Sequence, residues 1–183
     1  MEKEKITRII ELPEGYSLKI EGEIFIMSYN QKELKKEIKI PRGISIKIEG
    51  KKVVIEPQKK PTKKENKTIG SLAAHLTNMV KGLEKPFVCK MEACYAHFPM
   101  TMKVEGDMLV IKNFLGEKVP RTAKILPGVK VDVKGNSLEI SSEDIDAVGQ
   151  TVANIERATK VKERDRRIFQ DGIFLVEKNG REI

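Results

Sequence analysis

The stretch that decides the fold is Leu12-Pro-Glu-Gly-Tyr-Ser-Leu-Lys-Ile-Glu-Gly-Glu-Ile-Phe-Ile26. Leu18 and Ile20 alternate with polar neighbours, and after a Glu-Gly turn Ile24 and Ile26 resume the same alternation. Apolar residues at every second position, interrupted by a glycine turn, are typical of a β-hairpin. The leading proline suits a strand entrance because it has no N–H to donate to a neighbouring strand. We therefore predict an antiparallel hairpin here.

The same phrase returns three times along the chain, over residues 40–55, 98–111 and 126–140. Its prolines measure the spacing. Pro13 and Pro41 are 28 residues apart, as are Pro99 and Pro127, and the second pair follows the first by 86 residues. Regular self-similarity of this kind indicates duplication. The chain therefore contains two units, each with two hairpins.

A helix pattern follows the second hairpin of each unit, over residues 68–82 and 143–158. The apolar residues of the two stripes superpose with an offset of 76: Ile69, Leu72, Leu76 and Met79 in the first, and Ile145, Val148, Val152 and Ile155 in the second. Such a stripe packs on a sheet. Gly82 is the expected end of the first helix, and Ser141 with Asp144 the expected start of the second. We predict an α+β protein of two tandem duplicated domains, each with one helix packed on short, mainly antiparallel strands.

The expected domains are an N-terminal one over residues 1–84, a C-terminal one of the same fold over 85–176, and a loose polar tail over 177–183. Two charged segments join elements of the first domain. The Lys/Glu-rich segment 28–39 is expected to connect its hairpins, and the Lys-rich segment 57–67 to form an exposed loop before its helix.

The composition limits the classes of partner that the protein is expected to bind. The 183-residue chain has a net charge of +8 and a pI near 9.4, which favours a polyanionic partner. Nucleic acid is the first candidate and an anionic membrane surface the alternative. No apolar run approaches a membrane span and the first residues lack a signal-peptide core, so we expect a cytosolic protein without a membrane partner. The sequence gives no reason to expect a homo-oligomer.

Cysteine, histidine and acidic residues do not combine into a reactive site. The strand expected over residues 87–98 places Cys89 and Cys94 on opposite faces, and their spacing does not fit the common zinc sites. His75 has no nucleophile beside it and reads as a packed histidine. The acids around the start of the second helix are explained by its dipole. We expect no enzyme, no metal, no cofactor and no small-molecule substrate.

A basic run, Arg157–Phe169, joins the second helix to the strand expected over Gly172–Val176. It holds six bases and two acids, and the corresponding segment of the first unit, Lys81–Ala93, holds three bases and two acids. A helix-end dipole would act on both copies, so it does not explain the difference. The run indicates phosphate recognition. Phe169 is the one aromatic residue near the basic run. A single ring favours recognition of the backbone and shape of a nucleic acid over recognition of unstacked bases. A scaffold protein with only non-specific nucleic-acid binding is the alternative.

Four phrases support a more specific interpretation: Leu72–Gly82, Asn113–Lys118, Gly149-Gln150 and Asp165–Ile173. With the doubled layout, they resemble the universal large-subunit ribosomal protein six family in its archaeal and eukaryotic form. The resemblance covers essentially the whole chain, and Asp165–Ile173 is its most specific part. Bacterial members have a different sequence in place of residues 163–170, so their individual contacts there do not transfer.

The resemblance implies a structural protein of the large ribosomal subunit, in the cytoplasm. It implies binding to large-subunit rRNA near the sarcin–ricin loop and the base of the factor-binding stalk, beside neighbouring ribosomal proteins. The second domain would make most RNA contacts, and the first mainly protein contacts. Carried onto this chain, the RNA-binding residues would be Lys160, Lys162, Arg164, Arg166 and Arg167, then Gln150, Asn154 and Arg157 on the second helix, and then Lys112, Lys118 and Arg121 around the connector.

Overall fold

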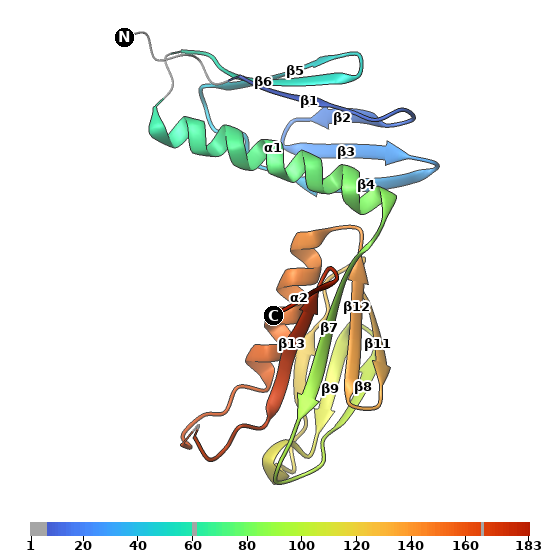
Figure 1. Cartoon of the computed structure of the whole chain (residues 1–183), viewed down its shortest axis with the longest axis vertical. Coiled ribbons are helices and arrows are strands. Elements are labelled where there is room, and N and C mark those ends of the chain that lie inside the picture. The colour runs from blue at the N-terminus through green and yellow to red at the C-terminus, as the bar shows by residue number, and fades with distance from the viewer. Residues whose placement is uncertain (1–6, 60–61, 166) are drawn as a thin grey trace. The chain divides into compact units, whose positions relative to one another are not determined.

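The computed structural model describes residues 7–59, 62–165 and 167–183. The chain divides into two compact units between Lys85 and Pro86. Over the described residues each unit has one α-helix and antiparallel strands (Figure 1). The predicted α+β class, with a duplicated arrangement of hairpins and helix, is therefore confirmed. Neither described helix is both long and apolar enough to cross a membrane.

The first unit contains two three-stranded antiparallel sheets, ordered β1-β6-β5 and β2-β3-β4. Its elements are β1 (Arg8–Glu11), β2 (Ser17–Glu21), β3 (Ile24–Tyr29), β4 (Lys32–Glu37), β5 (Ile44–Glu49), β6 (Lys52–Pro57) and α1 (Lys63–Glu84). Helix α1 contacts strands of both sheets. Its predicted stripe (Ile69, Leu72, Leu76 and Met79) is buried in their shared core with Phe25, Met27, Val53 and Ile55.

Helix α1 differs from the prediction at both ends. It begins at Lys63, inside the segment expected to be a loop, because Thr62 and Glu65 form a capping box. The Glu65 N–H donates to Thr62 Oγ1, and the Thr62 N–H donates to Glu65 Oε2. At the other end Gly82 is a buried helical residue. The helix continues to Glu84, and Pro86 follows its last turn.

The Lys/Glu-rich segment 28–39 is not a simple connector. Its residues 32–37 form β4, which pairs with β3 and places Leu34 opposite Met27. Only Leu34 and Lys36 of this strand are partly buried. An exposed edge strand carries charge on most positions, and charge at an edge opposes pairing with other molecules. The prediction missed the strand because one of its faces offers a single apolar residue.

The second unit contains a three-stranded sheet, β10-β9-β8, and a five-stranded sheet, β11-β12-β7-β13-β14. Its elements are β7 (Phe87–Cys94), β8 (Thr101–Glu105), β9 (Met108–Lys112), the 3-10 turn η1 (Phe114–Gly116), β10 (Arg121–Lys124), β11 (Lys130–Lys134), β12 (Ser137–Ser142), α2 (Ile145–Ala158), β13 (Gly172–Lys178) and β14 (Arg181–Glu182). Helix α2 lies along the strands and contacts both sheets (Figure 1).

The start and the buried face of α2 refine the prediction. Val148, Val152 and Ile155 are buried, whereas Ile145 is only half-buried at the first turn. Asp144 is the N-cap and accepts from the Asp146 N–H. The predicted pairing of Ser141 with Asp144 is wrong. The neighbouring Ser142 accepts from the Asp144 N–H and donates to the Gly128 carbonyl oxygen instead.

Over the described residues, β13 and β14 of the second unit have no counterpart in the first. Strand β7 pairs with β12 on one side and β13 on the other, whereas β1 stands at the edge of its sheet. The segment 177–183, which was predicted to be a loose tail, instead contributes to two strands. Strand β13 extends to Lys178, and β14 pairs back onto it through a turn at Asn179-Gly180. The segment that carries the basic run therefore connects α2 to the additional strands β13 and β14.

Candidate nucleic-acid interface

The described part of the basic run after α2 belongs to a loop, residues 160–165 and 167–171, between the end of α2 and the start of β13. In Figure 1 its described residues project from the lower end of the second unit, where β13 begins. The side chains of its described cations are exposed: Arg157, Lys160, Lys162, Arg164 and Arg167. Arg166 lies outside the described residues. The predicted cations therefore share one loop and the adjoining helix end.

Thr159 fastens the two ends of this loop to each other. It is 3% exposed, and its hydroxyl oxygen accepts the backbone N–H of Ile173 at 3.1 Å. The same hydroxyl lies within hydrogen-bond distance of the Ile155 carbonyl oxygen, one turn back in α2. The loop thus leaves the helix and enters β13 at two points held side by side.

Asp165 organises the outer part of the loop. Its Oδ1 accepts the Arg167 N–H at 2.9 Å, and its carbonyl oxygen accepts the Phe169 N–H at 2.9 Å. Such a carboxylate turn is a short-range structure that the chain forms without a helix or strand. Glu163 has a positive φ of 57°, which reverses the chain before this turn. The two acids of the run therefore shape the loop that presents its cations.

An aromatic stack supports the inner part. The Arg164 guanidinium lies 4.8 Å from the Phe169 ring centroid, and the Phe169 ring stacks on His97 at 4.8 Å. His97 Nδ1 in turn lies 3.1 Å from Asp171 Oδ1. Arg164 is thus connected through two rings to a buried carboxylate.

Asp171 is an ionised carboxylate with little exposure. It is 2% exposed, and its Oδ1 accepts the Ala96 N–H at 3.2 Å as well as contacting His97. Burial alone would raise the pKa of Asp171, but the hydrogen bonds from His97 and Ala96 outweigh it, so the pKa lies below its ordinary value. Its Oδ2 is buried and has no hydrogen-bond partner among the described residues.

Arg121 has a different surrounding from the other predicted RNA-binding cations. Its guanidinium donates to both carboxylate oxygens of Glu117, at 2.8 and 2.6 Å, and to the carbonyl oxygens of Ala158 and Lys160, at 2.9 and 3.1 Å. It also lies 4.2 Å from the Phe114 ring centroid. These hydrogen bonds from Arg121 hold the pKa of Glu117 below its ordinary value. Arg121 therefore fastens the connector to the end of α2.

The remaining predicted residues lie farther along the same unit. On α2, Gln150 Nε2 donates to Asn154 Oδ1 and Asn154 Nδ2 donates to the Lys124 carbonyl oxygen, so both amides contact the protein itself. Lys112 ends β9 and Lys118 follows η1, and both are exposed. The structure thus separates a central group on the loop from polar residues along the helix and the connector.

The two cysteines lie on opposite faces of β7, as the expected strand predicts. Cys89 is buried, and this burial raises the pKa of its thiol, whereas Cys94 is exposed on the other face of β7. No cluster of three or more metal-binding side chains occurs within the part of the chain that the structure describes.

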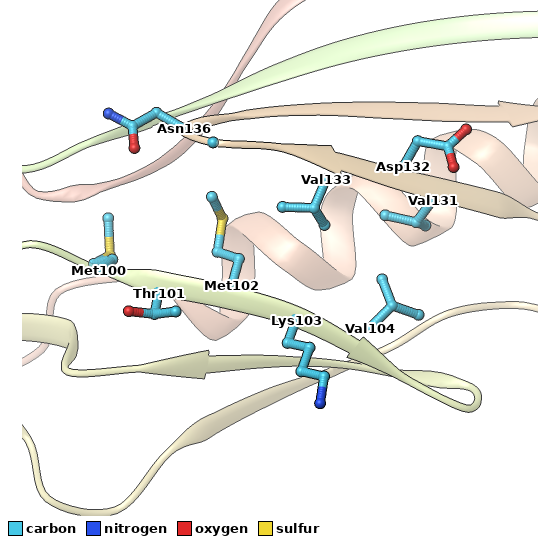
Figure 2. A pocket seen from close by; sticks show the side chains of 10 residues that line it. Met100, Thr101, Met102, Lys103, Val104, Val131, Asp132, Val133 and Asn136 are labelled. Atoms are coloured by element: carbon cyan, nitrogen blue, oxygen red, sulfur yellow. The ribbon is translucent and has the colours of Figure 1, made fainter.

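Two hollows open on the second unit. One, of about 610 Å³, separates β8 from β11, and Figure 2 shows Met102 and Val104 facing Val131 and Val133 across it. Its walls are mixed, with Thr101, Asp132 and Asn136 beside these apolar side chains, and the described cation that lines it is Lys103. The other, of about 720 Å³, lies at the root of the basic loop and is lined by Lys160, Phe169, Asp171 and Phe174, among others. Only the second hollow adjoins the predicted cations.

Sequence reasoning gave no role in the interface to Thr159, His97, Asp171 or Phe174. Thr159 and Asp171 are polar residues flanking a charged run, and no local pattern reveals that they are buried. His97 meets Asp171 only through the pairing of β7 with β13. Phe174 was predicted only as a strand residue. The alternation of side chains along Gly172–Val176 could have shown that its ring points outward.

Comparison with known proteins identifies the family. The family model described as ribosomal protein L6 matches residues 98–172. The chain is 46% identical over 174 residues to large ribosomal subunit protein uL6 of Methanosarcina mazei, covering 95% of this chain and 98% of that one. It is also 46% identical over 174 residues to uL6 of Methanococcus vannielii, covering 94% and 93%. A third uL6, from Methanosphaera stadtmanae, is 53% identical over 116 residues, covering 63% of each chain. Because the similarity spans nearly the whole length at this identity, the chain belongs to the uL6 family of large-ribosomal-subunit proteins.

Proposed function

We propose that this protein binds large-subunit rRNA mainly through its second unit and thereby supports translation. The observation that carries the proposal is the basic loop whose two ends are held together by the hydrogen bond between Thr159 and Ile173. Arg157, Lys160, Lys162 and Arg167 are exposed, and the loop that holds most of them is closed at its root by Thr159. Cations on a fixed frame bind phosphates at defined positions and lose little conformational entropy on binding.

The central RNA contacts in this proposal are the loop residues Lys160, Lys162, Arg164 and Arg167. Arg166 belongs to the same proposal from the sequence alone. Arg157, Gln150 and Asn154 form a flank along α2, and Lys112 and Lys118 a flank along the connector. Arg121 contributes by holding the end of α2 in place, since its guanidinium already donates to Glu117, Ala158 and Lys160.

The finer location rests on resemblance to the family. We propose that the bound rRNA lies near the sarcin–ricin loop and the base of the factor-binding stalk. The first unit would then contact mainly neighbouring ribosomal proteins. Its helix exit lacks the basic concentration of the second unit, and this difference between the two copies supports the division of roles.

The test is the salt dependence of binding to large-subunit rRNA. Each phosphate contact contributes about 0.9 to the slope of log affinity against log salt for a duplex. Replacing Lys162 and Arg167 with Ala should weaken binding and reduce the slope by about 2. The matched control is Lys63→Ala with Lys64→Ala, which removes two exposed lysines from the first turn of α1.

Equal loss of slope in both double variants would contradict the proposal, because it would mean that total charge, rather than the loop, determines affinity. An unchanged slope in the Lys162 and Arg167 variant would contradict it directly. Incorporation of each variant into large subunits, followed by a high-salt wash, gives the corresponding readout in the assembled particle.

A further inference from the structure

The hollow at the root of the basic loop has the features of a site for a planar aromatic ligand. It measures about 720 Å³ and lies between the end of α2, the loop and β13. Pockets for small organic groups fall in this size range and combine apolar walls with a few polar groups. Here the walls include two phenylalanines, and Lys160, Gln170 and Asp171 supply charge and hydrogen-bonding groups.

The two phenylalanine rings have different surroundings. Phe169 already stacks on His97 and lies beneath the Arg164 guanidinium. Phe174 is 48% exposed, although its neighbour Ile173 is 1% exposed, and it has no ring partner among the described side chains. An exposed aromatic ring beside exposed cations is the usual platform for an unstacked base.

Gly172 allows the Phe174 ring to lie close to the backbone of β13. A Cβ atom at Gly172 would stand 2.7 Å from Phe174 Cζ and 2.9 Å from its Cε2. The ring therefore occupies the space that a side chain would fill and borders the hollow. The absence of a side chain at Gly172 thus defines the wall against which a ligand would stack.

Polar groups at this wall match the edge and the phosphate of a nucleotide. Lys160 is exposed and lines the hollow, so its ammonium can meet a phosphate. Gln170 carries both donors and an acceptor in an exposed amide. Asp171 lines the same hollow, and its buried Oδ2 has no hydrogen-bond partner among the described residues. The exposed amide of Gln170 can therefore meet the edge of a base while Lys160 meets its phosphate.

We propose that this hollow receives one unstacked nucleobase of the bound RNA, which stacks on Phe174 while Lys160 contacts its phosphate. The inference deepens the proposed function and rests on it for the identity of the RNA. It adds direct base contact to a surface that the sequence predicted to contact only the backbone and overall shape of the RNA.

The experiment is an NMR titration of the isotope-labelled full-length protein with AMP, GMP, CMP and UMP, and with ribose 5-phosphate as the base-free probe. At least one nucleotide should shift the signals of Phe174, Gln170 and Cys94, which all line the hollow, whereas ribose 5-phosphate should leave Phe174 unshifted. Stacking on one aromatic ring corresponds to a loss of roughly 5- to 150-fold on alanine substitution. We therefore expect Phe174→Ala to weaken nucleotide binding at least fivefold, and Phe174→Tyr to retain it.

The matched control is Val176→Ala, which truncates an exposed apolar side chain two residues along the same strand and outside the hollow. It should keep the base-dependent shifts. Equal shifts with ribose 5-phosphate and with all four nucleotides would overturn the proposal, as would base-dependent shifts that persist in Phe174→Ala. These results are independent of the salt slopes of the Lys162 and Arg167 variant, which test rRNA binding itself.

Discussion

The hydroxyl oxygen of Thr159 accepts the backbone N–H of Ile173 at 3.1 Å, and so joins the first residue after α2 to the second residue of β13. The loop between them is closed at its base by one buried polar side chain. Closing a loop lowers the number of conformations that it can adopt. The cations of residues 160–170 are therefore presented in a smaller set of arrangements than an open tail would allow.

Replacing Thr159 with Val should open this base. Valine has nearly the same shape but leaves the Ile173 N–H without an acceptor in a buried site, which costs about 1–3 kcal/mol. Hydrogen exchange of the Ile173 amide should become faster by roughly 5- to 150-fold, the equivalent of that range. The control is Thr122→Val, at an exposed position of β10. Unchanged exchange at Ile173 would show that Thr159 does not fasten the loop.

Asp171 should make the stability of the second unit depend on pH in the acid range. Because the pKa of its carboxyl in the folded protein lies below the ordinary 3.8, its stabilising effect is complete above about pH 5 and declines as the pH falls through the folded value. The comparison is urea unfolding of the wild type and Asp171→Asn. The wild type should be more stable near pH 7, and the difference should shrink below about pH 4.

The control for that comparison is Asp107→Asn, which changes an exposed carboxylate in the β8–β9 turn. Its difference from the wild type should stay small at every pH. A difference for Asp171→Asn that is constant from pH 7 to pH 3 would contradict the role given to the carboxylate. A difference that grows toward acid would contradict the direction of the pKa shift.

The sequence predicted the architecture because the pattern of two hairpins followed by a helix occurs in both units. All four hairpins form, and the stripes of both helices face their sheets, with Ile145 at the margin. Strand β4 and the tail strand β14 escaped notice because Lys32–Glu37 and Arg181–Glu182 are dominated by charged residues. Pairing at a sheet edge requires only backbone groups, and such pairing leaves little trace in hydrophobic periodicity.

The sequence located the candidate interface but not its support. Its cations were readable as a local excess of charge, and family membership confirms that the protein is a ribosomal protein and not an enzyme. The contacts that shape the loop join distant positions, such as His97 with Asp171 and Arg121 with Ala158. These depend on strand pairing and on the path of the connector, and neither has a signature in the residues nearby.

The capping box of α1 offers a test of the part that the prediction placed in a loop. Thr62→Ala removes the acceptor of the Glu65 N–H, and loss of such an N-cap costs about 0.5–2 kcal/mol. Helical signals of residues 63–67 should weaken in NMR, while those of residues 72–82 remain. Thr68→Ala is the control, since its hydroxyl bonds to a carbonyl within the helix. Intact helical signals at 63–67 in Thr62→Ala would show that the cap is dispensable.

The substitution Arg121→Lys tests whether Arg121 holds the end of α2 in place or binds an RNA phosphate, because it keeps the positive charge. Lysine cannot reproduce the paired hydrogen bonds to Glu117 together with those to Ala158 and Lys160. We expect a loss of about 1–3 kcal/mol in the unfolding free energy of the second unit, with the slope of RNA affinity against salt preserved. Lys124→Arg, at an exposed position of the same strand, is the control. Full stability with a reduced slope would instead make Arg121 a phosphate ligand.

Gly172→Ala tests the place of the Phe174 ring without removing it. The new methyl group would lie 2.7 Å from Phe174 Cζ, so the ring must turn away, and an exposed ring can do so without disturbing the core. In the wild-type background the Phe174 ring signals should shift and any nucleotide affinity should fall. In the Phe174→Ala background the same substitution has nothing to displace. There it should be neutral, or stabilise the fold by about 0.4–1 kcal/mol through the lower entropy of the unfolded chain.

The double-mutant cycle formed by these two substitutions isolates their interaction. A large coupling in stability or nucleotide affinity would mean that Gly172 acts through the ring, as the distance between them implies. Additive effects would mean that Gly172 serves the backbone of β13 alone. The cycle is read only from variants whose NMR spectra show a folded protein, because an unfolded single variant would also give non-additive effects. The cycle thus decides whether the glycine that opens β13 shapes the hollow at the root of the basic loop.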